Sequence, residues 1–188
     1  MDSPLTPEGL KQADSLAERL SGIKFDAIYS SDLGRSMLTA RIISARMNGL
    51  QIYPDTRLRE RNFGIFHGYN REEIMRRYPE EGRLEKEANP DYTIPGGESR
   101  RQVLDRAVAF IDEIASRHEN SRILAVTHGG IVSSIVRHII QISLDTPRRF
   151  YLPNAAINVF EWCDKKWFVK TLGEISFHDG EELSDGIQ

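Results

Sequence analysis

The 188-residue chain has one cysteine, Cys163, so it can form neither an intramolecular disulfide nor a thiolate-rich metal site. It has no apolar run approaching the ~20 residues that a membrane-spanning helix needs, and its first residues lack the basic and apolar regions of a signal peptide. A formal net charge of −3 provides no overall positive field to attract nucleic acid or an anionic membrane. We therefore expect a cytoplasmic protein without nucleic-acid or membrane partners, in which any anion site is a local cluster of arginines.

What is present is an alternation of helical and strand patterns. Thr6 followed by Pro7 is a typical helix start, and Ser31-Asp32 is expected to cap a second helix. The continuous apolar run Ile123–Val126 is of the kind found in strands buried on both faces. The expected helices are 7–20, 33–47, 71–77, 99–118 and 131–140, and the expected strands are 26–30, 50–53, 123–126, 156–162 and 167–172.

Strands that alternate with helices predict an α/β fold, a three-layer sandwich in which helices cover both faces of a mostly parallel central sheet. We expect a single domain over residues 1–178 and an acidic, flexible tail over 179–188. Residues 55–97 are the least regular part, interrupted at Pro79 and at later prolines, and are expected to cross the active face.

Two segments that follow strands, 30–35 and 127–130, lie at the sheet edge where open α/β sheets bind ligands. His128 would face a phosphate-sized site there, because Gly129 and the next glycine allow close backbone approach and begin a helix with free N–H groups. Arg35 lies at the same edge, where its planar guanidinium could bond two phosphate oxygens. Each signal is weak by itself, since a histidine after a strand is more often structural and a helix arginine is usually solvated.

A further candidate is Glu60, in a glycine-punctuated loop where a carboxyl group beside a phosphate could protonate a leaving alcohol. By itself, a loop glutamate is usually only surface. Together, however, these segments resemble the histidine phosphatase, or phosphoglycerate mutase-like, superfamily, in the family order over nearly the whole chain. The resemblance is carried by 2–9, 29–35 with Thr39 and Ala40, 58–61 with Gly64 and Gly68, 95–99 with Arg106, 126–130 and 152–157.

The resemblance implies covalent phosphoryl transfer without a metal or cofactor: a histidine nitrogen attacks a phosphate ester, and water or a second alcohol discharges the phosphohistidine. It assigns phosphate binding to Arg35 and His128 and proton donation to Glu60. Arg61 becomes a contact to the substrate anion, and Asn154 borders the pocket. The expected function is hydrolysis of a small phosphorylated metabolite, with phosphoglycerate mutase-type transfer as the alternative. The candidate protein assembly is a homodimer.

The family carries its nucleophilic histidine in an Arg-His-Gly turn after the first strand, upstream of the segment that begins here at Asp2. None of the five histidines of this sequence stands between an arginine and a glycine. The first strand is therefore expected to be missing too, which would leave unpaired strand edges. We expect the native gene product to extend further upstream and to have an intact mass above the 21.5 kDa of these 188 residues.

Two other interpretations stay open. Without a nucleophile, Arg35 and His128 would make the protein a phosphate-binding pseudoenzyme, which the detection of an acid-labile phosphohistidine would contradict. A metal hydrolase is less favoured, because the sequence lacks a compact ligand motif such as His-Glu-x-x-His. Its ligands would be His128 with Glu60, Asp32 or His67.

Overall fold

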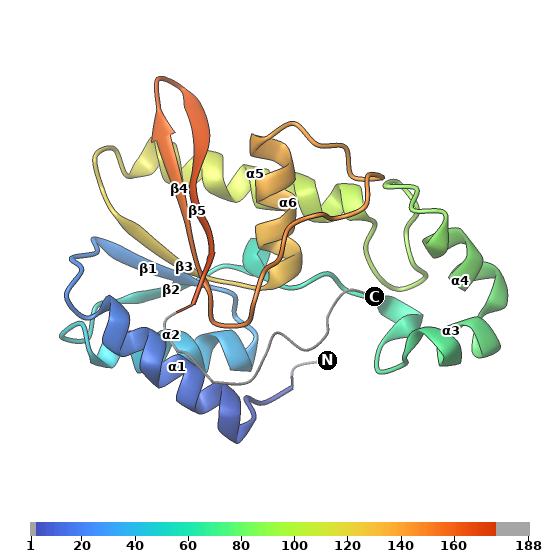
Figure 1. Cartoon of the computed structure of the whole chain (residues 1–188), viewed down its shortest axis with the longest axis horizontal. Coiled ribbons are helices and arrows are strands. Elements are labelled where there is room, and N and C mark those ends of the chain that lie inside the picture. The colour runs from blue at the N-terminus through green and yellow to red at the C-terminus, as the bar shows by residue number, and fades with distance from the viewer. Residues whose placement is uncertain (1–2, 176–188) are drawn as a thin grey trace.

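A computed structural model describes residues 3–175 of the chain, with three parallel strands at the centre in the order β2-β1-β3 (Figure 1). β1 (Ala27–Ser30) is the middle strand, and all four of its residues are buried. β2 (Ile52–Pro54) pairs with one edge of β1, and β3 (Ile123–Val126) pairs with the other. The predicted parallel sheet is confirmed.

Two pairs of helices cover the two faces of this sheet, which makes the predicted three-layer α/β sandwich (Figure 1). α1 (Pro7–Leu20) and α2 (Gly34–Ala45) pack on one face. α5 (Arg100–Arg117) and α6 (Gly129–Ile139) pack on the other. Successive side chains of a strand point to opposite faces, so β1 and β3 can support two separate hydrophobic cores.

The boundaries of the longer helices follow local signals. The Thr6 side chain accepts a hydrogen bond from the Gly9 N–H at the start of α1, with Pro7 as the first helical residue. Ser99 caps α5 in a reciprocal capping box with Gln102. The apolar stripe predicted for α5 is the side that packs in the core, and its buried members are Val103, Ala107, Phe110, Ile111 and Ile114.

Two short helices form a lobe at one end of the sheet (Figure 1). α3 (Arg71–Arg77) has the predicted bounds and begins with a capping box between Asn70 and Glu73. α4 (Pro79–Lys86) was not predicted, because Pro79 was interpreted as a break. Proline is favoured in the first turn of a helix, where its missing N–H has no partner to lose, so the same residue that ends α3 begins α4.

Two local predictions are wrong. β3 is not buried on both faces: Ala125 is exposed, because among the described strands β3 pairs with β1 alone. The N-cap residue of α2 is Leu33, which provides no side-chain cap, so neither Ser31 nor Asp32 holds the cap position. Asp32 instead pairs with Arg59, with an Nη2–Oδ2 distance of 2.5 Å.

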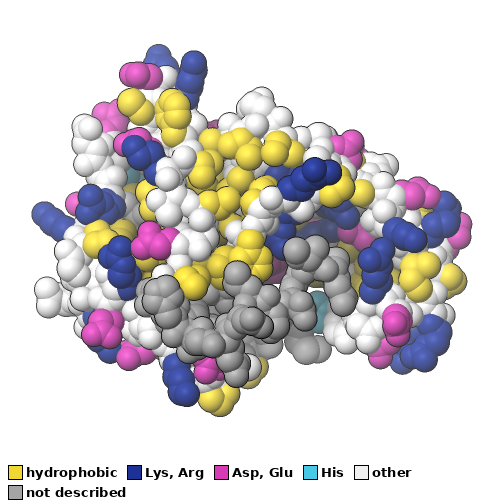
Figure 2. All heavy atoms as spheres, viewed as in Figure 1, with side chains coloured by type: hydrophobic (Ala, Val, Ile, Leu, Met, Phe, Trp, Pro, Cys, Tyr) yellow, Lys and Arg dark blue, Asp and Glu magenta, His cyan; other side chains and the backbone are white. Residues whose placement is uncertain are grey.

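The last strands, β4 (Ile157–Cys163) and β5 (Lys166–Glu174), form the predicted hairpin as a separate two-stranded antiparallel sheet. Asp164 and Lys165 at its turn both have positive φ, as in the two-residue turns that match the twist of a hairpin. Apolar side chains lie open on the face of the molecule shown in Figure 2, and those exposed on the hairpin include Val159, Trp162 and Phe168.

Two 3-10 turns, η1 (Thr56–Leu58) and η2 (Gly64–Phe66), lie between β2 and α3. Within residues 3–175, no helix is both long and apolar enough to cross a bilayer. The tail predicted over 179–188 lies outside the described residues.

Candidate active site

His128 and Arg35 are brought together at the carboxyl ends of β3 and β1. His128 is the N-cap residue of α6 and is 8% exposed. Its Nδ1 lies 3.1 Å from Arg35 Nη2, and its Nε2 lies 3.0 Å from Ser31 Oγ and 3.2 Å from Ser36 Oγ. A guanidinium can only donate, so Nδ1 is the acceptor and the ring proton sits on Nε2, where a serine hydroxyl accepts it. The imidazole is therefore held at both nitrogens.

The parallel pairing of β1 with β3 is the cause of this proximity. The Ser31 N–H donates to the Val126 carbonyl at 2.9 Å, so the ladder continues past the end of β1. Residues that follow two adjacent parallel strands emerge at the same edge of the sheet. Two serines orient His128: Ser31 was expected only as a helix cap, and Ser36 was not singled out from the sequence. Their only signal was position, because Ser31 directly follows β1 and Ser36 directly follows Arg35.

Glu60 lies at the start of α6, beside His128. Its Oε2 accepts a hydrogen bond from the Gly130 N–H at 3.2 Å, and its Oε1 accepts one from the Arg61 N–H at 2.8 Å. The free N–H groups at the start of a helix suit an acceptor oxygen at this position. A Cβ on Gly130 would lie 2.2 Å from Glu60 Oε1, so the approach of the carboxyl requires glycine there. Gly130 belongs to the family motif at residues 126–130, but that motif did not predict its contact with Glu60.

Gly129 differs from its neighbour. It is exposed, and a Cβ built on it would meet no atom within 4 Å. Its N–H forms no hydrogen bond with another described residue, as is usual in the first turn of a helix, and such groups suit anions. The geometry is compatible with phosphate binding at Gly129, which stays a prediction.

Arg61 forms an ion pair with a carboxylate of the α3–α4 lobe. Its Nη1 and Nη2 contact the two carboxyl oxygens of Glu85 at 2.8 and 3.0 Å, and its Nε donates to the Glu98 carbonyl at 3.0 Å. Burial alone would raise the pKa of Glu85, but the hydrogen bonds and charges of Arg61 and Arg100 hold it below its ordinary value. Arg61 therefore links the loop that carries Glu60, residues 58–68, to the lobe; we call this loop the acid loop. The contact of Arg61 with a substrate stays a prediction.

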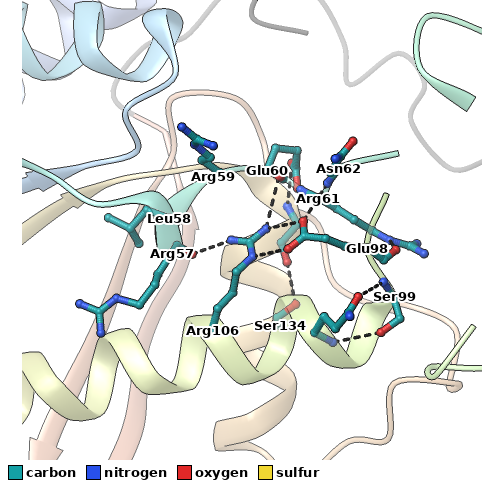
Figure 3. A network of polar contacts seen from close by, with 12 residues as sticks. Arg57, Leu58, Arg59, Glu60, Arg61, Asn62, Glu98, Ser99, Arg106 and Ser134 are labelled. Atoms are coloured by element: carbon teal, nitrogen blue, oxygen red, sulfur yellow. Dashed lines mark hydrogen bonds and ion pairs between the residues drawn. The ribbon is translucent and has the colours of Figure 1, made fainter. Parts of the chain in front are cut away.

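Arg106 of α5 fixes the backbone of the acid loop (Figure 3). Its guanidinium forms a bidentate pair with Glu98, at 2.9 and 3.1 Å, and also donates to the carbonyls of Arg57 and Glu60 at 2.6 and 3.3 Å. Burial opposes ionisation of Glu98, but the hydrogen bond from Arg106 and further donors keep its pKa below the ordinary value. The position of the Glu60 backbone thus depends on an ion pair between α5 and the loop before it.

The other candidates lie apart from this arrangement. Asn154 is exposed in the turn before β4 and forms no hydrogen bond with another described residue, so its place at the pocket border stays a prediction. The metal-hydrolase ligand set is not assembled: across residues 3–175, no three His, Cys, Asp or Glu side chains are grouped to hold a metal ion. Asp32 pairs with Arg59, and His67 ends the η2 turn.

Known proteins resemble this chain in sequence and in fold. The sequence model of the histidine phosphatase superfamily (branch 1) matches residues 1–175. The probable phosphoglycerate mutase GpmB of Escherichia coli is 34% identical over 189 positions, which cover 98% of this chain and 87% of GpmB. The solved structure of Bacillus stearothermophilus YhfR is 30% identical, with a TM-score of 0.83 over 93% of this chain and 86% of YhfR.

A mycobacterial glucosyl-3-phosphoglycerate phosphatase is 26% identical, with a TM-score of 0.78 over 93% of this chain and 90% of that structure. The family match extends over all the described residues and includes every element that carries the site. Phosphatases and mutases are the enzymes named among these proteins. The chain therefore belongs to the histidine phosphatase superfamily.

Proposed function

We propose that the protein hydrolyses a small phosphomonoester at the site formed by Arg35, His128 and Glu60. One observation carries the proposal: the Arg35–His128 pair lies beside a carboxyl group held at the N-terminus of the same helix that His128 begins. A cation, an imidazole and a carboxyl acid are the groups needed to bind a phosphate and to protonate a leaving oxygen.

In the reaction of this superfamily, a histidine nitrogen forms a bond to phosphorus while the bond from phosphorus to the ester oxygen breaks. Glu60 is placed to give its proton to the departing oxygen, so that an alcohol leaves rather than an alkoxide. Water then attacks phosphorus and gives a proton to the Glu60 carboxylate, the phosphorus–nitrogen bond breaks, and inorganic phosphate is released. No histidine of these 188 residues stands in an Arg-His-Gly turn, so the nucleophile is not assigned to a residue of this chain.

Arg35 and His128 act on the phosphoryl oxygens. The transition state of phosphoryl transfer spreads negative charge over three equatorial oxygens, and donors that are already oriented stabilise it without reorganising. Ser31 and Ser36 hold the imidazole in one orientation, and Arg35 is held against its other nitrogen. A phosphate would take over donors of Arg35 that now point at Nδ1.

The test combines binding with turnover. Binding of inorganic phosphate and vanadate is measured by calorimetry, and hydrolysis is measured with phenyl phosphate and an alkyl phosphate. Arg35→Ala should abolish anion binding, while Arg41→Ala, an exposed arginine of the same helix, should not. Glu60→Gln should impair the alkyl phosphate about 100-fold and phenyl phosphate much less, because a better leaving group needs less protonation. Anion binding that survives Arg35→Ala would refute the site.

A second candidate is a phosphate-binding protein that does not turn substrate over. It is favoured by the absence of an Arg-His-Gly turn from the 188 residues. Acid-quenched labelling with a radioactive phosphomonoester separates the two functions, because hydrolysis through a histidine leaves an acid-labile phosphohistidine. Phosphate binding without labelling or turnover, in protein produced from the native gene, would favour the binding function and contradict hydrolysis.

A further inference from the structure

The phosphate-binding residues and the proton donor are carried by two separate segments of the chain. Ser31 and Arg35, which contact His128, lie in residues 31–36 after β1; we call these residues the phosphate segment. Glu60 lies in the acid loop, which follows β2 and the η1 turn. A proton donor acts only within hydrogen-bond reach of the leaving oxygen, so the two segments must be held at a fixed separation.

An ion pair joins the two segments at positions adjacent to the site residues. Arg59 donates two hydrogen bonds to Asp32, from Nε to Oδ1 at 2.6 Å and from Nη2 to Oδ2 at 2.5 Å. Asp32 directly follows Ser31, and Arg59 directly precedes Glu60. Two parallel bonds between a guanidinium and a carboxylate fix their orientation as well as their distance. The hydrogen bond from Arg59 is the main reason why the pKa of Asp32 lies below its ordinary value.

The acid loop is also held from other sides. Arg106 of α5 donates to the Glu60 carbonyl at 3.3 Å, and the Thr127 hydroxyl donates to the Leu58 carbonyl at 2.9 Å. Figure 3 shows Arg59 on the opposite side of the loop from Arg106. The loop is therefore anchored to α5, to the end of β3 and, through Arg59, to the phosphate segment. Of these three anchors, the ion pair is the one that ends on the phosphate segment.

The exposure of the ion pair separates its effect on position from its effect on stability. The side chain of Arg59 is 50% exposed, and that of Asp32 is 28% exposed. Exposed ion pairs contribute little to the free energy of unfolding, because water and salt screen the charges and both side chains lose freedom. Misplacing a reacting group by ~1 Å, in contrast, can slow a reaction about 100-fold. Loss of the pair should therefore affect the site more than the Tm.

We propose that Asp32 is a positioning residue for the proton donor. Through Arg59 it holds the Glu60 carboxyl at the start of α6, beside the phosphate segment. This inference rests on the proposed function, since a proton donor needs a bound phosphate ester to act on. Without the ion pair, the backbone next to Glu60 loses one of its three anchors. The contact that should weaken is the hydrogen bond from the Gly130 N–H to Glu60 Oε2, which is 3.2 Å long.

The position of the Glu60 carboxyl can be followed without turnover. The amide resonance of Gly130 in a nitrogen–proton correlation spectrum depends on its acceptor, and Glu60→Ala gives the resonance position without that acceptor. Asp32→Asn removes the charge and keeps the size of the side chain, so it should move the resonance toward that position. Arg59→Met removes the other half of the pair and should do the same. Asp32→Arg combined with Arg59→Asp exchanges the two charges and should return the resonance toward its wild-type position.

Asp14→Asn is the matched control, because Asp14 forms an exposed ion pair of the same length, 2.5 Å, with Arg46. It should leave the Gly130 resonance in place. Wherever turnover occurs, Asp32→Asn should lower kcat/KM about tenfold or more for the alkyl phosphate and less for phenyl phosphate, since a poorer leaving group depends more on proton donation. The affinity for inorganic phosphate should not change, because the groups that bind phosphate are intact.

The outcomes are separable once thermal unfolding shows that each variant is folded. A Gly130 resonance that moves no more in Asp32→Asn than in Asp14→Asn overturns the positioning role and leaves the proposed function standing. A shift that the charge exchange fails to reverse does the same, because the ion pair would not be its cause. Equal losses of turnover for both esters would also overturn it, as a general structural effect. If the wild type binds no inorganic phosphate, the proposed function fails and the positioning role with it.

Discussion

Replacing Gly130 with alanine places a methyl group against the Glu60 carboxyl, 2.2 Å from Oε1 and 3.1 Å from Cδ. The φ angle of Gly130 is not among the positive values, so alanine introduces no backbone strain. Glu60 must therefore move, and it loses the hydrogen bond from the Gly130 N–H. The perturbation acts on one contact between the acid loop and α6.

The magnitude follows from two opposing effects. Losing a hydrogen bond to a charged group lowers the free energy of unfolding by about 1.5–3 kcal/mol. Alanine in place of a helical glycine raises it by at most about 1 kcal/mol. The net loss is about 0.5–3 kcal/mol, which lowers the Tm of a domain of this size by about 1–12 °C.

A double-mutant cycle followed by circular dichroism measures the effect. In a Glu60→Ala background the methyl group meets no carboxyl, so Gly130→Ala should be neutral or raise the Tm. Gly129→Ala is the matched control, because a Cβ there has nothing within 4 Å and its effect should not depend on Glu60. If Gly130→Ala lowered the Tm equally in both backgrounds, the contact between Gly130 and Glu60 would not be the cause.

Three further predictions concern the surrounding loop. In denaturant titrations, Gly64→Ala should lower the free energy of unfolding by more than Gly68→Ala. Both glycines have positive φ, which costs an alanine about 1–2 kcal/mol, but only a Cβ on Gly64 would meet backbone, 2.2 Å from the Pro95 carbonyl oxygen. Equal losses in the two variants would contradict this explanation. Because the pKa of Glu98 is lowered from 4.5, its contribution to stability is present above about pH 4.5 and is lost as the pH falls through the folded value. Arg106→Met should flatten that part of the stability profile, and an unchanged acid slope would show that the ion pair is not responsible. Tyr92→Phe should leave stability unchanged or raise it by up to about 1 kcal/mol, because the buried hydroxyl has no partner among the described residues; a loss above that size would reveal an unseen bond.

Short-range sequence signals determined most helices and the order of elements. Thr6 and Pro7 set the start of α1, and α3 has the bounds that its flanking glycine and proline indicated. The same proline was misjudged for α4, because a proline both stops a preceding helix and starts a following one. Helix starts and ends can be predicted from these signals because they depend on residues that are neighbours in the chain.

The motifs of the family also indicated where three candidate residues lie in the fold: Arg35 and His128 come after strands, and Glu60 lies in the loop that faces α6. What the local pattern could not predict was the exposure of Ala125. A continuous apolar run is typical of a buried strand, but burial depends on which strands pair with it, and pairing is a property of the whole sheet.

Tertiary structure alone decided the partners of the site residues. The bonds of His128 to Ser31, Ser36 and Arg35 join segments more than 90 residues apart. Arg61, expected to contact the substrate, also forms an ion pair with Glu85, because a buried guanidinium needs a carboxylate close by. The amino-acid sequence by itself determined which helices form and which chemical groups are available. The folded chain determined which charges are paired, such as Asp32 with Arg59, because charge pairing depends on distance in space.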